Sequence, residues 1–311
     1  MGSIINGLSK MNYNKAELEN EELNIENVIS LINKFDNFDE INLCNIINGL
    51  AQLGYRKKDL QGLNIDNIAN GVDKNIQKLS ELGISNLING LVKIYFIDEN
   101  NNPKVIEIIN LLLKRLAEIR NVEENINTVN NTENNNKTSL NLNLFYLKAI
   151  KKVNGVNIPT NLNISNYAIF DKERTSLEKD FKEKYLNDIG SNFQEEVEIL
   201  SSIEHDSIKY KHHIDFYCEF EGHKLYIELD GPSHFVGNDS NVKNSQTIVR
   251  DEINRSIISK TRGAYYITIS MNEFNHYKNN NYPLGKLLSS KINGLFRGAN
   301  ENLDALNEKQ L

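Results

Sequence analysis

The stretch from Ile214 to Phe235 constrains the fold of this chain more than any other. Apolar and polar residues alternate before Glu221-Gly222, and the alternation resumes after it. This period-two pattern predicts two half-buried strands joined by a tight turn. A two-residue or four-residue loop gives one register, whereas a three-residue loop with a bulge shifts it by one residue. In the first register the opposed pairs are Phe216 with Ile227, Cys218 with Leu225, and Asp215 with Glu228.

Two acidic residues, Asp215 and Glu228, face each other in this predicted hairpin. Directly opposed side chains have Cβ atoms about 4.5–5.5 Å apart, and like charges at that distance destabilise the pair. Solvent, a shared proton, a nearby Lys or Arg, or a divalent cation relieves the repulsion. Asp230 follows on the same face, so that three carboxylates converge at one strand end. Such a group suits Mg²⁺ or Mn²⁺, but acids that simply face water give the same pattern.

The run Ile227–Phe235, IELDGPSHF, resembles the signature of the RAP domain, an RNA-associated domain. Asp215-Phe216 upstream and the predicted strand after Gly263 fit the same pattern. The RAP domain is similar in fold to the very-short-patch repair endonucleases, within the PD-(D/E)XK nuclease superfamily. The resemblance covers roughly residues 176–275. It implies an α/β restriction-endonuclease-like domain with a mixed sheet.

The resemblance also implies site residues. Asp215 matches the metal-binding Asp, Glu228 the following acidic ligand, and Glu178 the acid often found on the first helix. Asp230 stands where the superfamily usually has a catalytic Lys, although RAP-like sequences commonly carry Asp there. His234 has the chemistry to position a water, contact a phosphate or transfer a proton. The resemblance therefore implies catalytic roles for Asp215, Glu228, Asp230 and His234, with Mg²⁺ or Mn²⁺ held by the three acids and Glu178.

Each of these residues also has a plainer interpretation. An acid in the first turn of a helix, as expected for Glu178, is favoured by the helix dipole whatever its chemistry. His234 lies in a Gly-Pro turn, where a histidine commonly bonds to the backbone. In the predicted register His213 faces Asp230, which favours a simple His–Asp surface pair. The sequence leaves these alternatives open.

The N-terminal third contains an internal repeat with a period near 40 residues, in which the motif Ile-Asn-Gly-Leu places Gly7, Gly49 and Gly90 in one frame. Such a period predicts paired helices that stack into a solenoid. Glycine costs a helix about 1 kcal/mol relative to alanine, so its recurrence indicates close approach of helix backbones. The segment resembles the octotricopeptide or heptatricopeptide repeats that precede RAP domains and contact RNA. Helical solenoids bind proteins at least as often.

A composition change marks the predicted domain boundary, because residues after the N-terminal helices are rich in Asn and poor in apolar side chains. The resulting class is an α+β multidomain protein. The predicted segments are a helical repeat domain at 1–124, an Asn-rich linker at 125–141, a connecting helix and loop at 142–175, the RAP or endonuclease-like domain at 176–280, and a C-terminal helix and tail at 281–311.

Within the predicted RAP domain, residues 193–200 are ambiguous between helix and strand, and we predict a helix. Residues 236–246 are polar and rich in Gly and Asn, which indicates a mobile flap. A helix at 247–261 followed by a strand at 264–270 implies a right-handed crossover and parallel pairing. Arg255 has the spacing of an ordinary helix pair with Asp251. The basic residues expected to contact nucleic acid are Arg250, Arg255, Lys260, Arg262 and Lys211.

The composition is typical of a soluble globular protein, with 25% charged and 39% apolar residues. The net charge of −7 argues against a generic nucleic-acid binder, so a phosphate-binding surface has to be local. The chain has no apolar run of membrane-spanning length and no signal peptide. Cys44 and Cys218 fall in different predicted domains, which favours buried thiols and a cytoplasmic protein.

Two functions from different classes follow. The first is an RNA-binding protein in RNA processing or maturation, whose nuclease-like domain cleaves RNA with a divalent metal. The second is a catalytically inactive scaffold whose helical repeats bind a protein partner. The missing Lys and the acidic net charge oppose cleavage, whereas the presence of every acid in the pattern favours it.

Overall fold

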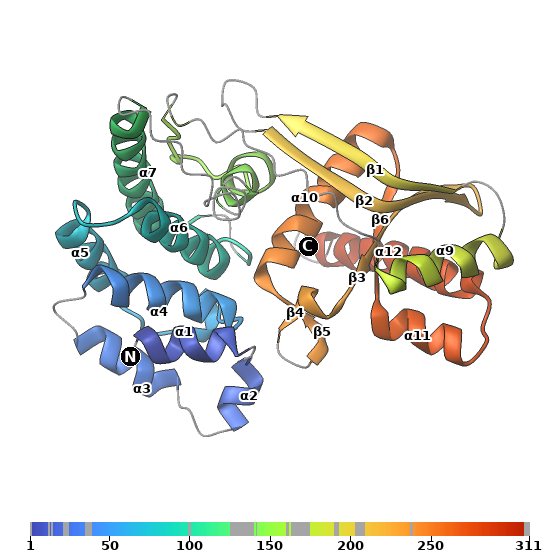
Figure 1. Cartoon of the computed structure of the whole chain (residues 1–311), viewed down its shortest axis with the longest axis horizontal. Coiled ribbons are helices and arrows are strands. Elements are labelled where there is room, and N and C mark those ends of the chain that lie inside the picture. The colour runs from blue at the N-terminus through green and yellow to red at the C-terminus, as the bar shows by residue number, and fades with distance from the viewer. Residues whose placement is uncertain are drawn as a thin grey trace. The chain divides into compact units, whose positions relative to one another are not determined.

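The computed structural model describes residues 2–11, 13, 15–20, 25–34, 39–98, 101–124, 140, 142–159, 162, 175–189, 193–202, 209–236 and 239–307. The chain divides into two compact units (Figure 1). The first unit comprises Met1–Phe170, Leu200–Lys211 and His234–Ile253, and the second comprises Asp171–Ile199, His212–Ser233 and Asn254–Leu311. Two segments of the first unit, Leu200–Lys211 and His234–Ile253, fall within the residue range of the predicted RAP domain.

The first unit is mainly helical. Its helices are α1 (Gly2–Lys10), α2 (Lys15–Asn20), α3 (Ile25–Lys34), α4 (Glu40–Gln52), α5 (Ile65–Asn75), α6 (Glu81–Tyr95) and α7 (Pro103–Glu124), with a 3₁₀ turn η1 (Lys57–Asp59) and a π-helical segment η3 (Tyr146–Ile150). The side chains of Asp39 and Ser80 accept hydrogen bonds from backbone N–H groups in the first turns of α4 and α6. These N-caps fix where the two helices begin.

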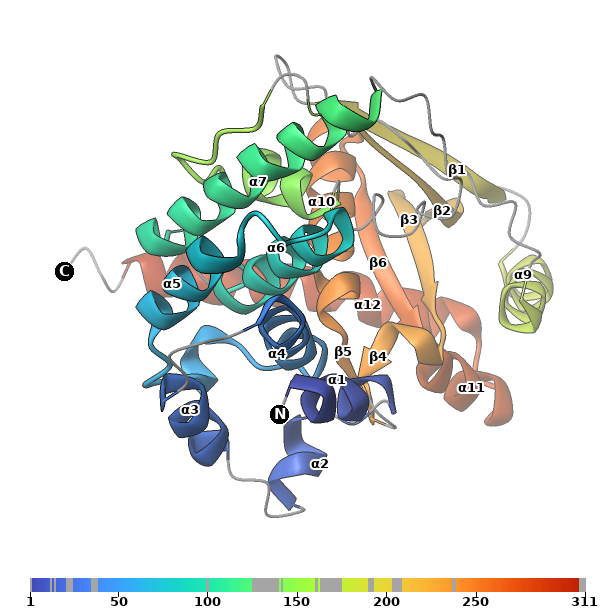
Figure 2. The same cartoon turned by 60° about the vertical axis from the view of Figure 1, so that its left-hand side comes forward.

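Helices α1, α4 and α6 carry the three copies of the glycine motif and pack side by side in that order (Figure 2). A Cβ atom added to Gly49 would lie 2.7 Å from Ile5 Cγ2 of α1, and one added to Gly90 would lie 2.8 Å from Ile47 Cγ2 of α4. At Gly7 the same atom would meet no described atom within 4 Å. The expected close approach of backbones is thus confirmed at two of the three glycines.

Segments far along the chain complete the first unit. β4 (Phe235–Val236) and β5 (Asp239–Lys243) form a two-stranded antiparallel sheet, where the sequence predicted a mobile flap. Helix α10 (Ser245–Arg262) begins in this unit, and Ser245 Oγ donates a hydrogen bond to the Ala51 carbonyl at 2.9 Å. Tyr146 donates another to Glu252 at 2.8 Å. These long-range contacts explain why the unit is discontinuous in sequence.

The second unit contains a four-stranded mixed sheet with the order β1-β2-β3-β6. Its elements are α9 (Ser176–Asp188), β1 (Phe193–Ser202), β2 (Lys209–Phe220), β3 (His223–Asp230), β6 (Tyr265–Ser270), α11 (Met271–Asn279) and α12 (Leu284–Asn307), with a 3₁₀ turn η4 (Pro232–His234) after β3. β2 and β3 are antiparallel, and β3 and β6 are parallel, as predicted.

The prediction of a helix at 193–200 is wrong, because these residues form most of strand β1. Three glutamates favoured a helix. In the structure Phe193 packs on the rings of Phe181 and Phe216, and alternate residues after it are exposed. Glu195 occupies an inner position through an ion pair with Lys182 at 2.5 Å. Aromatic packing and this ion pair outweigh local propensity.

The hairpin register is the predicted one, with Phe216 opposite Ile227 and Cys218 opposite Leu225. Glu221 and Gly222 both have positive φ angles, +49° and +78°, as a two-residue hairpin turn of type I′ requires. The apolar face of the hairpin joins one core with residues of α9, α11 and α12 (Figure 1). The second half of α10 contacts the opposite face, where Arg262 bonds to Tyr226 and Asn254 to Tyr266.

Among the described residues, no helix combines the length and the apolar character that crossing a bilayer requires.

Candidate functional site

The two acids predicted to oppose each other, Asp215 and Glu228, lie just beyond the described end of the β2–β3 ladder, and their opposition is not among its described pairs. The last described pair in this direction is Phe216 with Ile227. One residue before it, the Asp215 carboxylate accepts a hydrogen bond from the backbone N–H of Leu229, at 2.7 Å from its Oδ2 atom. The Asp215 side chain thus accepts the kind of hydrogen bond that a main-chain carbonyl of the neighbouring strand accepts in a regular antiparallel pair. A charge-assisted bond of this kind stabilises the ionised carboxylate without any metal.

Glu228 and Asp230 are the two buried acids of β3, with exposed fractions of 4% and 0%. Nε2 of His212 lies 3.4 Å from Oε1 of Glu228. The expected His213–Asp230 pair is not what the structure shows, because His213 lies 3.3 Å from Glu198. The described β2–β3 pairs end at Phe216, so their register does not carry over to His212 and His213. His212, rather than its neighbour, therefore lies beside Glu228.

Glu178 lies in the first turn of α9 and is 9% exposed. The Thr175 hydroxyl donates to its carboxylate at 3.0 Å and accepts from its backbone N–H at 3.3 Å. These bonds close the N-terminus of the helix, where a carboxylate also favours the helix dipole. The structure thus gives Glu178 a capping role that needs no metal.

The fit to a divalent metal can be tested directly on the acids. In the part of the chain that the structure describes, no three His, Cys, Asp or Glu side chains form a group that could hold a metal ion. The predicted ligands Asp215, Glu228, Asp230 and Glu178 are therefore not preassembled as a set there.

His234 belongs to the first unit, whereas the predicted acids belong to the second. Its Nδ1 atom lies 3.3 Å from Nη2 of Arg250. Arg250 also approaches Asp251, whose carboxylate forms a 2.6 Å ion pair with Lys243. Arg250 and Lys243 thus both engage Asp251, the residue that the sequence paired with Arg255. Lys211, the other predicted basic contact in this unit, is half-buried.

The polar face of the hairpin carries an aromatic and cationic arrangement that sequence reasoning missed. The Arg262 guanidinium donates to the Tyr226 hydroxyl at 2.7 Å and to the Glu198 carbonyl at 3.0 Å. It also lies over the Tyr226 ring, 5.4 Å from its centroid. The Tyr226 and Tyr217 rings are 5.0 Å apart. The three side chains therefore form a continuous series, Arg262–Tyr226–Tyr217.

Tyr217 is the half-exposed member of this series. Desolvation, followed by its hydrogen bond to Glu219, raises the pKa of its hydroxyl. Arg255 and Lys260 are exposed on the same half of α10 as Arg262. We name the Arg262–Tyr226–Tyr217 series, together with the two exposed cations Arg255 and Lys260 from the same half of the helix, the α10 patch. The signal in the sequence that could have revealed this aromatic pair was the direct opposition of Tyr217 and Tyr226 in the predicted register.

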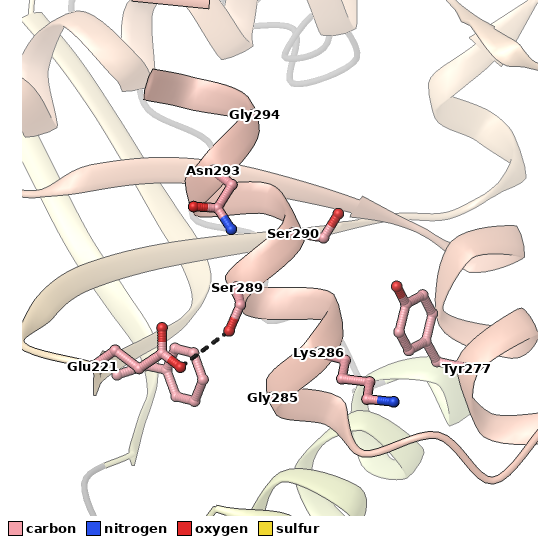
Figure 3. A pocket seen from close by; sticks show the side chains of 9 residues that line it. Glu221, Tyr277, Gly285, Lys286, Ser289, Ser290, Asn293 and Gly294 are labelled. Carbon is pink, nitrogen blue, oxygen red and sulfur yellow. Dashed lines mark hydrogen bonds between the residues drawn. The ribbon is translucent and has the colours of Figure 1, made fainter. Parts of the chain in front are cut away.

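A separate hollow of about 770 Å³ lies beside the hairpin turn, lined by residues of α11, α12 and the turn (Figure 3). Ser289 donates a hydrogen bond to Glu221 at 3.1 Å across it, and Lys286 supplies its ammonium group. None of the predicted site residues lines this hollow. It is therefore distinct from both the acids and the α10 patch.

A scan of the chain against protein-family models finds no match, and a search of curated proteins finds none either.

Proposed function

We propose that this protein binds RNA and acts in RNA processing or maturation. The α10 patch is the observation that carries this proposal. Aromatic rings and arginine guanidinium planes stack on unpaired bases, and cations beside them bind the phosphate backbone. The resemblance of the hairpin sequence to the RAP domain supports the same function.

The arrangement of the patch suits single-stranded RNA. Two hydrogen bonds and the Tyr226 ring hold the Arg262 guanidinium, so little side-chain entropy remains to be lost on binding. Tyr217 offers a half-exposed ring at the other end of the series. Because the whole chain carries a net charge of −7, binding would rely on this local cationic surface.

The test is a titration of labelled single-stranded RNA at several salt concentrations. We expect the double variant Arg255→Ala, Lys260→Ala to bind more weakly, because both side chains are exposed cations. The slope of log K against log salt should become shallower by about 0.7 for every phosphate that the variant no longer neutralises. Lys179→Ala removes one exposed cation of α9, outside the patch, and as a control should bind like the wild type. Equal affinity and slope in the double variant would rule out the patch as the RNA-binding surface.

A second proposal is metal-dependent cleavage of the bound RNA. The observation that favours it is the burial of Glu228 and Asp230 two residues apart on β3, since buried carboxylates are costly and concentrate at functional sites. Mn²⁺-dependent cleavage of labelled RNA should disappear in Glu228→Gln and Asp215→Asn while RNA binding persists. Cleavage that continues unchanged in these variants or in chelator would remove this proposal and leave binding intact.

The scaffold alternative gives a different result in the same titration. If no RNA binds at physiological salt, the helical repeats become the candidate surface for a protein partner.

A further inference from the structure

The three repeat helices place equivalent side chains in different surroundings. Ile46 of α4 and Leu87 of α6 precede their glycines by three residues, and both are buried. Leu53 and Ile94, four residues after the glycines, are buried as well. Their counterparts in α1 are Ile4 and Met11, each 64% exposed.

The contact between successive repeat helices follows one rule. A branched apolar side chain of one helix, Ile5 or Ile47, packs on the glycine of the next helix, Gly49 or Gly90. Between α1 and α4, two polar contacts accompany it. Asn6 donates to Asn45 at 3.2 Å, and Ser9 donates to Gln52 at 2.8 Å.

By the same rule Gly7 is a binding position, or seat, on which a branched apolar side chain of another helix could pack, and none of the described residues occupies it. Ser3 and Lys10 hold the positions that correspond to Asn45 and Gln52. We name Ser3, Ile4, Gly7, Lys10 and Met11 the α1 outer face. It presents the glycine contact that the protein already forms twice, and the two polar positions that α4 uses against α1.

A second copy of this chain cannot supply the matching helix from its described repeats. Ile5 and Ile47 already pack on glycines within the first unit. Ile88, the third equivalent residue, is fully buried, and its neighbour Asn89 accepts a hydrogen bond from Asn143 at 3.0 Å. Among the described helices that carry the motif, each face that could pack on Gly7 is therefore in use.

We propose that the α1 outer face binds a helix of the same repeat class, presented by a partner protein. The partner helix seats a branched apolar side chain on Gly7. It places a polar side chain one residue later against Ser3, and a hydroxyl or carboxylate four residues later beside Lys10. The complex buries Ile4 and Met11, as α4 and α6 bury their equivalents. This surface is independent of the RNA proposal.

The experiment supplies a surrogate for the partner helix. A copy of residues 39–83 is joined ahead of Met1 of the full chain, so that Ile47 of the copy precedes Gly7 by the spacing that separates Ile47 from Gly90. The fusion gives the surrogate a high effective concentration. Peptide mass spectrometry then follows peroxide oxidation of Met11. We expect the extension to slow this oxidation about tenfold, because sulfoxide formation follows exposure of the thioether.

Gly7→Leu provides the specificity control. A leucine in open space leaves the unextended chain folded, which circular dichroism checks, but it blocks the seat. Recovery of fast Met11 oxidation in the extended Gly7→Leu chain supports the proposal. Equal rates with and without the extension, or slow oxidation that Gly7→Leu leaves unchanged, would overturn it. Oxidation of the unextended chain that slows as its concentration rises would identify a second copy as the occupant, and would overturn it too.

Discussion

The helical repeats of the first unit and the sheet of the second unit bury apolar side chains in contrasting ways. The repeats make one contact twice, with an isoleucine on a glycine at each step. The sheet makes one core once, from α9, the hairpin, β6, α11 and α12. The same substitution can therefore be compared at equivalent positions of the repeat helices, whereas the core of the sheet offers no equivalent positions. Because a substitution in the sheet disturbs its single core, we expect it to lower the free energy of unfolding more than one at a repeat contact.

Phe216→Ala should have the largest effect. The Phe216 ring is buried and packs on the rings of Phe181 and Phe193, with centroids 5.1 and 4.8 Å away. Removing a buried phenylalanine side chain typically costs about 3–5 kcal/mol. Hydrogen exchange followed by mass spectrometry should show the loss of protection in the second unit. Equal loss in α1, α4 and α6 would contradict the separation of the two units.

Lys93 places a charge at a position where the preceding repeat helix has a neutral side chain. It follows Gly90 by three residues, as Gln52 follows Gly49, and it is buried. Burial, with a smaller contribution from Arg56, lowers its pKa from 10.5 to about 8. The unfolded chain thus binds more protons between these two pH values, so the free energy of unfolding rises with pH across them. Below pH 8 the buried Lys93 is charged in the folded state, and this lowers the free energy of unfolding by about 3 kcal/mol.

Lys93→Met should remove this pH dependence. Urea unfolding of both proteins at about pH 7 and about pH 10 isolates it, because other titrating groups contribute equally to the two proteins. The stability of the wild type relative to the variant should rise with pH by a few kcal/mol. A constant difference would mean that Lys93 reaches solvent or a counter-charge.

Gly90→Ala should have a moderate effect. The new Cβ atom would lie 2.8 Å from Ile47 Cγ2 and 2.9 Å from the Ile47 carbonyl oxygen, and that backbone atom cannot rotate away. Overpacking costs about 1–3 kcal/mol, and the better helix propensity of alanine returns up to about 1 kcal/mol. Thermal unfolding should show a net loss. An unchanged midpoint would show that α4 and α6 separate without cost.

Gly7→Ala should have the smallest effect and the opposite sign. No described atom lies within 4 Å of the new Cβ atom, so only the helix propensity changes. We expect a gain of up to about 1 kcal/mol. The same substitution in the same motif then has opposite outcomes in α1 and α6. A loss at Gly7 would show that its seat is already occupied.

Local patterns predicted the elements that depend on neighbours in sequence. The Glu221-Gly222 turn and the alternation around it were sufficient for the register of the hairpin. The recurrence of glycine predicted the tight contacts at Gly49 and Gly90. Both features follow from backbone geometry over a few residues.

Features that depend on distant contacts were missed. Strand β1 forms where Phe193 meets aromatic rings from α9 and β2, which no local propensity reports. His212 rather than His213 lies beside Glu228, at positions to which the register of the described β2–β3 pairs does not extend. The bonds of Ser245 and Tyr146 that join the first unit link residues far apart in the chain. The catalytic and metal-binding roles inferred from the family resemblance stay predictions.

The hydrogen bond between the Asp215 side chain and the Leu229 backbone has a consequence for how this chain can vary. Because a side chain, and not the β2 main chain, satisfies that N–H group, the bond depends on which residue stands at 215 and not only on the course of the backbone. A ladder bond survives any exchange that keeps the strand extended, whereas this one requires a short acceptor such as Asp or Asn. An apolar residue at 215 would leave the Leu229 N–H group without this acceptor.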